Sequence, residues 1–259
     1  TQYLFYQNKY LSKKILYANF IIFQSRYSLL QCKRITRLSK KYFSKCYVLS
    51  TPGVDTSFFL PSKVQTFPKQ IKILSIGRLE EAKGFPILLK AINLLKSQFP
   101  DIRLTIIGDG SQKNQLEKYI FKNKLEDNIK LLGFIGHEPK LIKIIHRHQY
   151  FILPSITDSQ KVHDVHPNVI KEAMSCGLIV VASNLGGITE IINNKKNAFL
   201  INKITPQNLV RIIRSIESLS VMQKNEVSQK ARQTIMESHQ QKEICYKLKN
   251  IFLKYSCED

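Results

Sequence analysis

Two cations stand on a glycine-flanked turn that follows a run of β-branched residues. Arg78 and Lys83 lie in the segment Gly77–Gly84, between a predicted strand and a predicted helix. A guanidinium and an ammonium beside the free N–H groups of a helix N-terminus suit the phosphate oxygens of a diphosphate. The alternative is a solvated loop, in which Glu80 and Glu81 only complement the dipole of the following helix.

Two carboxylates flank the start of a second predicted helix. Asp164 precedes Pro167, which suits the first position of a helix. Glu172 lies about 1.4 turns into that helix, where its carboxylate suits a pair of vicinal hydroxyl groups such as those of ribose. Asp164 is placed to meet another polar group of the same ligand. Two alternatives to ligand binding remain for these carboxylates. They could form a general acid/base pair, or they could be only a helix cap and a surface glutamate.

Other turns and histidines carry weaker signals. Gly186 and Gly187 permit close approach of the backbone to a ligand, or simply a tight turn. Gly108-Asp-Gly110 lacks the third glycine of the dinucleotide fingerprint. Four histidines invite a metal reading, but their spacing matches no standard site, so the sequence predicts no metal ion. These histidines are His146, His148, His163 and His166.

The elements that position these turns follow an alternating pattern from about residue 46. Short β-branched runs alternate with longer amphipathic stretches, which predicts a doubly wound α/β fold with a parallel sheet covered on both faces. The carboxyl ends of such strands form the ligand crevice, so the turns described above would meet there. After Thr205 the pattern is helical to the end. The predicted strands are Cys46–Ser50, Ile71–Ile76, Arg103–Ile107, Ile129–Leu132, Tyr150–Leu153, Leu178–Ala182 and Ala198–Ile201. The predicted helices between them include Phe85–Phe99, Gln112–Lys122, Pro139–His146 and Pro167–Ser175.

The first 45 residues predict a separate set of elements. They comprise a helix over Tyr3–Tyr17, a strand over Asn19–Gln24 and a basic helix over Ser28–Tyr42. One strand and two helices cannot enclose a core of their own, so we expect this segment to belong to another domain. The segment Ser50–Gln70, with three prolines, is the predicted boundary.

The chain of 259 residues is strongly basic, with 40 Lys and Arg against 19 Asp and Glu and a formal net charge of +21. Residues 1–50 hold ten of these cations and no acidic residue. Such a charge favours a nucleic acid, a phosphorylated ligand or an acidic membrane surface, while biased composition would leave the same charge merely solvated. No RNA- or DNA-binding signature is present, so we expect no nucleic acid partner.

Composition also bounds the class and compartment of the protein. At 43% hydrophobic residues the chain is not a disordered one. Five cysteines without a CxxC pair indicate reduced thiols of a cytosolic protein. The apolar run Ile15–Phe23 is too short to span a bilayer.

Taken in order, these segments resemble the retaining family 4 glycosyltransferases of the GT-B fold, over roughly residues 46–202. The matching segments are Pro52–Asp55 with the following Phe58 or Phe59 and Pro61, Gly77-Arg78, Lys83-Gly84, Gly108–Gly110, Leu132–Phe134, Leu153–Ser155, Pro167–Met174 and Gly186–Glu190. The resemblance implies a Rossmann-like, nucleotide-sugar-binding domain at residues 48–235. Residues 1–47 would be the remnant of an N-terminal acceptor-binding domain. Residues 236–259, with a helix over Gln240–Tyr255, would pack back on that domain.

The family's activity implies roles for particular residues. The resemblance implies transfer of a hexose-type sugar, with retention, from a nucleotide-sugar donor to a glycan or lipid-linked acceptor in surface polysaccharide or lipopolysaccharide synthesis. Arg78, Lys83 and Asp164 would be catalytic, and Glu172 would contact the ribose. The implied donor-binding residues are Gly77, Arg78, Lys83, Phe134, Asp164, His166, Pro167, Asn168, Val169 and Glu172. With two cations available and no DxD pair, neither a cofactor nor a metal ion is expected.

Two departures from the family pattern bear on activity. Asp164 stands where the family usually has a glutamate, and Val165-His166 replaces a glycine-led turn, which implies a changed contact with the sugar. Because most of the acceptor domain is expected to be missing, we expect this chain alone to bind a nucleotide sugar weakly and to transfer poorly. The expected location is the cytoplasm, peripherally at an anionic membrane surface. The alternatives are a non-catalytic remnant that only binds nucleotide sugar, and a basic nucleic-acid-binding protein.

Overall fold

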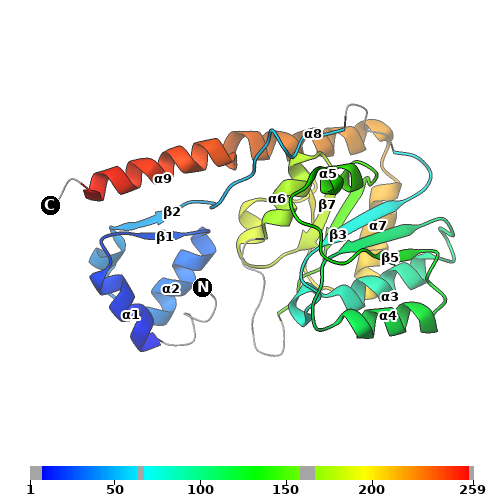
Figure 1. The fold of residues 1–259 in the computed structure, drawn as a ribbon, viewed down its shortest axis with the longest axis horizontal. Helices are drawn as coiled ribbons and strands as arrows, with labels where there is room; N and C mark the ends of the chain where they lie inside the picture. The colour runs from blue at the N-terminus through cyan, green and yellow to red at the C-terminus, as the bar shows by residue number, and fades with distance from the viewer. Residues whose placement is uncertain (1–7, 63–66, 158–166, 257–259) are drawn as a thin grey trace.

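The computed structural model describes residues 8–62, 67–157 and 167–256. At its centre is a six-stranded sheet with the order β5-β4-β3-β6-β7-β8 (Figure 1). Every neighbouring pair of these strands runs parallel. The first strand of this sheet along the chain is β3. The next two strands, β4 and β5, lie on one side of β3, and the last three, β6, β7 and β8, lie on its other side. The strands are β3 (Lys72–Ile76), β4 (Arg103–Ile107), β5 (Ile129–Leu131), β6 (Tyr150–Leu153), β7 (Ile179–Ser183) and β8 (Phe199–Ile201). In this doubly wound topology the ligand crevice lies where β3 and β6 end side by side.

Helices cover both faces of the sheet, and each face has its own apolar core. The helices are α3 (Phe85–Leu95), α4 (Lys113–Lys122), α5 (Pro139–Ile145), α6 (Asn168–Ser175), α7 (Pro206–Glu217) and α8 (Val221–Ser238), with short 3₁₀ turns η3 (Glu81–Lys83) and η4 (Gly186–Glu190). On one face α3 packs against α7, and on the other α6 packs against α8. Leu88 and Leu209 belong to the first core, and Ile170 and Ile235 to the second. Burial on both faces explains why the strands read as nearly continuous apolar runs, and the α/β fold predicted from them is confirmed.

Residues 8–48 form a smaller unit, called the N-terminal unit below. Its elements are α1 (Asn8–Tyr17), β1 (Ile21–Phe23), α2 (Arg26–Thr36), η2 (Lys40–Phe43) and β2 (Cys46–Val48). Ile15, Phe23, Cys32 and Phe43 form its small apolar core. The predicted strand at Cys46 exists, but it pairs with β1 in a separate two-stranded sheet instead of joining the strands that follow it.

The second basic helix is shorter than predicted. It ends at Thr36, because Arg37 adopts a left-handed conformation (φ 52°) and donates its N–H to the carbonyl of Lys33 at 3.1 Å. A 3₁₀ turn over Lys40–Phe43 follows. The single helix predicted over Ser28–Tyr42 is therefore wrong in its second half, since helical propensity alone does not reveal a left-handed cap.

The last helix, α9 (Gln241–Ser256), continues beyond α8 and reaches over the N-terminal unit (Figure 1). The rings of Phe252 and Tyr255 lie 5.0 and 5.2 Å from the ring of Phe20. The N-terminal unit is therefore covered by the far end of the chain. Among the helices of the described ranges, none is both long enough and apolar enough to cross a lipid bilayer.

Candidate functional site

The turn after β3 packs tightly against the end of β6. Gly84 has a left-handed conformation (φ 68°), and a Cβ atom at this position would lie 2.1 Å from the carbonyl oxygen of Pro154. The N–H of Ile156 donates to the carbonyl of Ala82 at 2.9 Å. Only glycine permits this contact, so Gly84 fixes the predicted cation-bearing turn at the crevice.

The two predicted cations lie on this turn in different surroundings. The Arg78 side chain is 72% exposed, and its Nη1 lies 3.0 Å from Glu80 Oε1. Lys83 is half-buried, and its Cδ and Cε lie 3.5 Å from the position of a Cβ built on Gly77. An exposed ion pair contributes only about 0–1 kcal/mol, so a phosphate group arriving at Arg78 can displace Glu80.

Glu172 lies in a pocket of about 380 Å³, called the Glu172 pocket below. The carboxylate comes from α6, which begins at Asn168; Pro167 is the N-cap of this helix and not its first residue. Although it carries a carboxylate, Glu172 is only 7% exposed. The residues that line the pocket are Pro52, Gly53, Val54, Asp55, Phe58, Phe59, His137, Asn168, Glu172 and Gln241.

The charge of Glu172 is set by burial and by two neighbouring side chains, those of His137 and Lys171. Burial raises the pKa of its carboxyl, while His137 and Lys171 act in the opposite direction. Nε2 of His137 lies 3.6 Å from Oε1 of Glu172, and the imidazole is 65% exposed at the mouth of the pocket. A buried carboxyl with a raised pKa beside a titratable histidine is typical of a functional site.

A second acceptor in the pocket comes from the first turn of α6. Oδ1 of Asn168 is buried and, within the described part of the chain, has no hydrogen-bond partner. A buried acceptor left unsatisfied costs about 1–3 kcal/mol. Together with the carboxylate of Glu172, this oxygen offers acceptors to the hydroxyl groups of a bound ligand.

Two phenylalanines form the apolar wall of the pocket. The rings of Phe59 and His137 lie 5.4 Å apart, edge to face, and Phe58 packs on Phe59 at 5.0 Å. Arg232 from α8 holds this segment by donating to the carbonyls of Phe59 at 2.8 Å and Thr56 at 3.1 Å. The pocket therefore joins an apolar wall to polar acceptors, as ligand sites commonly do.

The structure brings together only part of the predicted donor site. Asn168 and Glu172 share the pocket, and Pro167 and Val169 flank them at the start of α6. Gly77, Arg78 and Lys83 lie on the β3–α3 turn, outside the lining of the pocket as the described residues define it. Phe134 is 78% exposed on the loop after β5. Asp164 and His166 lie outside the described residues.

The sequence did not single out His137. The only signal was its place after β5, on a loop that leaves the carboxyl edge of the sheet, where functional side chains gather. Of the histidines that had invited a metal reading, His163 and His166 lie outside the described residues, and His146 and His148 have other partners. His148 bonds to the carbonyl of Ile144 at 2.7 Å and to Oγ1 of Thr105 at 2.9 Å, and His146 bonds to the carbonyl of Leu60 at 2.8 Å. The described ranges contain no group of three metal-ligating side chains.

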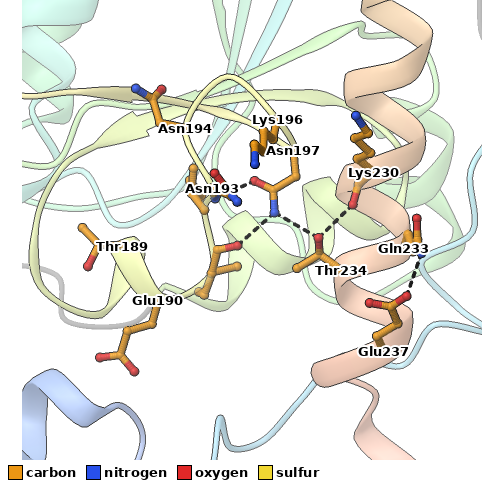
Figure 2. Close-up of a pocket in the computed structure, with 12 residues that line it drawn as sticks. Thr189, Glu190, Asn193, Asn194, Lys196, Asn197, Lys230, Gln233, Thr234 and Glu237 are labelled. Atoms are coloured by element: carbon orange, nitrogen blue, oxygen red, sulfur yellow. Dashed lines mark hydrogen bonds between the residues drawn. The ribbon is translucent and has the colours of Figure 1, made fainter.

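A larger pocket, of about 690 Å³, lies between the turn after η4 and the second half of α8. Figure 2 shows hydrogen bonds that join Asn197 to Thr234 and Gln233 to Glu237 in its lining. Nδ2 of Asn197 donates to Oγ1 of Thr234 at 2.9 Å and to the carbonyl of Ile191 at 3.2 Å. Gln233 and Glu237 pair along α8 at 2.7 Å. These bonds account for its polar lining as a structural network, so we assign the candidate site to the smaller Glu172 pocket.

Comparison with known proteins agrees with this fold. The family model for glycosyl transferases group 1 matches residues 58–234. The chain is similar to the putative colanic acid biosynthesis glycosyltransferase WcaL of Escherichia coli K12, with 28% identity over 197 residues, 76% of this chain and 48% of that protein. It is also similar to the amylovoran biosynthesis glycosyltransferase AmsK of Erwinia amylovora, with 35% identity over 161 residues, 62% of this chain and 39% of that protein. The chain thus spans less than half the length of these two relatives.

Among solved structures, the Anabaena protein HepE in complex with UDP and glucose has the same fold. It superposes with a TM-score of 0.76 at 20% identity, over 92% of this chain and 64% of the HepE chain. The six-stranded sheet and its helices are therefore a Rossmann-like sheet domain of the GT-B type.

Proposed function

The chain belongs to the glycosyl transferases group 1 family, and from that premise we propose that it binds a nucleotide sugar where β3 and β6 end and takes part in transferring the sugar to a glycan acceptor. The observation that supports this most directly is the Glu172 pocket. Its buried carboxylate and Oδ1 of Asn168, which has no partner among the described residues, are acceptors suited to a polyhydroxylated ligand, and ribose and hexoses are such ligands.

The cations of the β3–α3 turn supply the remaining chemistry. Negative charge grows on the nucleoside diphosphate as its bond to the sugar breaks. Arg78 and Lys83, close to the N-terminus of α3, are suited to stabilise that charge, and one such group typically lowers the barrier by about 3 kcal/mol. Because these cations supply positive charge, we propose that neither a metal ion nor a cofactor takes part, so that chelators leave donor binding unchanged. Retention of anomeric configuration, as in family 4, is part of the same proposal.

The substrate class rests on the relatives. WcaL and AmsK are named for colanic acid and amylovoran biosynthesis, and HepE has been solved with UDP and glucose. We therefore propose a UDP-sugar as the first donor to test, and a surface polysaccharide or a lipid-linked precursor as acceptor. In this proposal the N-terminal unit belongs to the acceptor-binding side, and its ten cations lie against the anionic cytoplasmic face of a membrane.

Calorimetric titration with UDP-, GDP- and ADP-sugars tests the donor site. We expect one donor class to bind, Glu172→Gln and Arg78→Ala to weaken binding, and Arg211→Ala, which removes an exposed arginine on α7, to leave it unchanged. Absence of binding by every donor would overturn the proposal. Binding without transfer to any acceptor would instead support a chain that only holds the nucleotide sugar.

A further inference from the structure

A lysine without exposed surface lies beside the pocket carboxylate. Lys171 precedes Glu172 on α6 and is 0% exposed. Its Nζ donates to Oγ of Ser50 at 3.1 Å and to the carbonyl of Ser50 at 3.3 Å. Burying an ammonium is unfavourable unless hydrogen bonds compensate it, so its position here calls for a physical reason.

Ser50 connects this lysine to the end of α8. Oγ of Ser50 lies 3.0 Å from Nδ1 of His239, which is itself only 9% exposed. Ser50 follows the last strand of the N-terminal unit, and His239 stands between α8 and α9. Lys171 is thus bonded to the segment through which the N-terminal unit joins the sheet domain.

Backbone contacts close the same region, which we call the linker junction (Ser50, Gly53, Val54, His239 and Gln241). Val54 donates to the carbonyl of His239 at 2.8 Å, and Gln241 donates to the carbonyl of Val54 at 2.9 Å. A Cβ on Gly53 (φ 81°) would lie 2.8 Å from the Cα of Gln241. The linker and the start of α9 therefore approach as closely as a glycine allows.

The linker junction is also a wall of the Glu172 pocket. Gly53, Val54 and Gln241 line that pocket together with Glu172. Consecutive residues of a helix point about 100° apart, so α6 turns Glu172 to the ligand side and Lys171 to the linker side. A second cavity, of about 180 Å³, borders the junction and is lined by residues of both units, among them Gln24, Ser50 and His239. It leaves room for the junction to shift.

We propose that Lys171 is a positioning residue, whose buried side chain holds the linker junction against α6 through its bonds to Ser50 and so couples occupancy of the Glu172 pocket to the seating of the N-terminal unit. The inference rests on the proposed function only in that a nucleotide serves as the pocket's ligand. The mechanical part, a lysine that fixes the linker, does not depend on it.

The pH at which Lys171 loses its proton allows this role to be distinguished from simple packing. Burial lowers the pKa of its ammonium to about 8, with Glu172 acting in the opposite direction. The charged and titratable groups facing this region are Glu172 on α6, His239 between α8 and α9, Glu190 on η4 and Lys247 on α9. Burial lowers the pKa of His239 to about 4, so this imidazole does not change charge between pH 7 and pH 9. A change in that window that depends on Lys171 therefore reports its ammonium.

The test compares wild type with Lys171→Met, Lys171→Arg and the matched control Lys90→Met, which alters an exposed lysine of α3. The first measurement is amide hydrogen exchange in residues 50–56 and in the first turn of α9, without ligand. We expect exchange about tenfold faster in Lys171→Met, corresponding to about 1.4 kcal/mol, and unchanged in Lys90→Met. Unchanged exchange in Lys171→Met would overturn the positioning role, whether or not the protein binds nucleotides.

The second measurement is UDP affinity at pH 7 and pH 9. Because burial lowers the pKa of Lys171, the seated junction favours its neutral amine, so in wild type we expect affinity to rise from pH 7 to pH 9. Neither Lys171→Met nor Lys171→Arg loses a proton at this position between pH 7 and pH 9, so neither variant should show this rise. An identical pH response in wild type and Lys171→Met would overturn the coupling. Lack of UDP binding by wild type, with normal hydrogen exchange results, would instead count against the proposed donor and leave the positioning role supported.

Discussion

The carboxylate of Glu190 accepts the backbone N–H of Tyr27 at 2.7 Å. Its other oxygen accepts the N–H of Arg26 at 2.9 Å. Glu190 lies in η4 of the sheet domain, whereas these two residues open α2 of the N-terminal unit. An acidic side chain at a helix N-terminus is favoured by the free N–H groups and by the helix dipole. This contact and the bond from Lys171 to Ser50 therefore hold the two parts of the protein together at separate points.

Replacing Glu190 by alanine removes both acceptors. We expect a loss of about 1 kcal/mol in the free energy of unfolding, the size of a typical helix cap, with faster hydrogen exchange in the first turn of α2. Ser25 still accepts from Ser28 N at 3.1 Å, so the helix itself should persist. Glu226→Ala, which only breaks an exposed pair with Lys230, serves as control. Equal exchange in both variants would show that Glu190 does not hold the unit.

Arg78→Ala should impair the transfer step more than folding. The side chain is 72% exposed and forms an exposed ion pair with Glu80, so stability should change by less than about 0.5 kcal/mol. If the guanidinium stabilises the leaving diphosphate, kcat falls about 100-fold. Steady-state kinetics with Arg211→Ala as reference checks this. A variant with raised KM and unaltered kcat would assign Arg78 to ground-state binding instead.

The pH dependence of donor binding should respond to His137. Burial raises the pKa of Glu172, so its carboxylate gains a proton, and the site loses an acceptor, as the pH falls through that raised value. His137 opposes this shift, so His137→Gln should move the acidic limit of binding to higher pH. Since the pair is partly exposed, we expect affinity near that limit to fall about two- to fivefold. Calorimetry between pH 5 and pH 8 measures it, and an unmoved limit would exclude an electrostatic role for His137.

Lys171→Met should stabilise the protein at neutral pH. The folded chain releases this proton at about pH 8, whereas an unfolded chain holds it to about pH 10.4. The unfolded state therefore binds more protons between these values, stability rises with pH there, and the penalty is complete below pH 8. After allowing for the lost bonds to Ser50, we expect a gain of about 1–3 kcal/mol at pH 7 that shrinks towards pH 10. Urea unfolding of wild type and Lys171→Met at pH 7 and pH 10 measures this difference. A variant less stable than wild type at pH 7 would contradict a pKa of Lys171 lowered by burial.

Attachment to anionic vesicles should depend on the N-terminal unit. Each Lys or Arg near such a surface contributes about 1 kcal/mol, so Lys40→Glu with Lys41→Glu should weaken binding by at least tenfold. Lys118→Glu with Lys122→Glu makes the same change in net charge on exposed positions of α4 and should have a smaller effect. Sedimentation with acidic and neutral vesicles at two salt concentrations measures this. Equal binding to both lipids would refute an electrostatic attachment.

The sheet could be predicted closely because its information is local. Arg103–Ile107 and Tyr150–Leu153 are strands with the predicted bounds, since an apolar run between turn residues specifies a buried parallel strand. The partner of a strand is not local information. The strand at Cys46 pairs with Ile21, and nothing in either segment distinguishes that pairing from a place in the larger sheet.

The site was predictable where a residue stands directly on a turn at the sheet's carboxyl edge. Asn168 and Glu172 could be placed there because the helix containing them begins at that edge. Lys171 could not, because a lysine on a short helix normally points to solvent. Its partner is Ser50, which bonds in turn to His239, and both residues lie far from Lys171 in the sequence.

Because its cations are unbalanced in the N-terminal unit, the molecule has an asymmetric charge distribution as well as a net charge. That unit lies at one end of an elongated molecule (Figure 1), and its ten Lys and Arg have no acidic residue within it to balance them. The field of an anionic surface exerts a torque on such a charge distribution at distances comparable to the Debye length, about 8 Å at physiological salt. Near such a surface the protein would therefore turn before contact, with its basic end towards the surface.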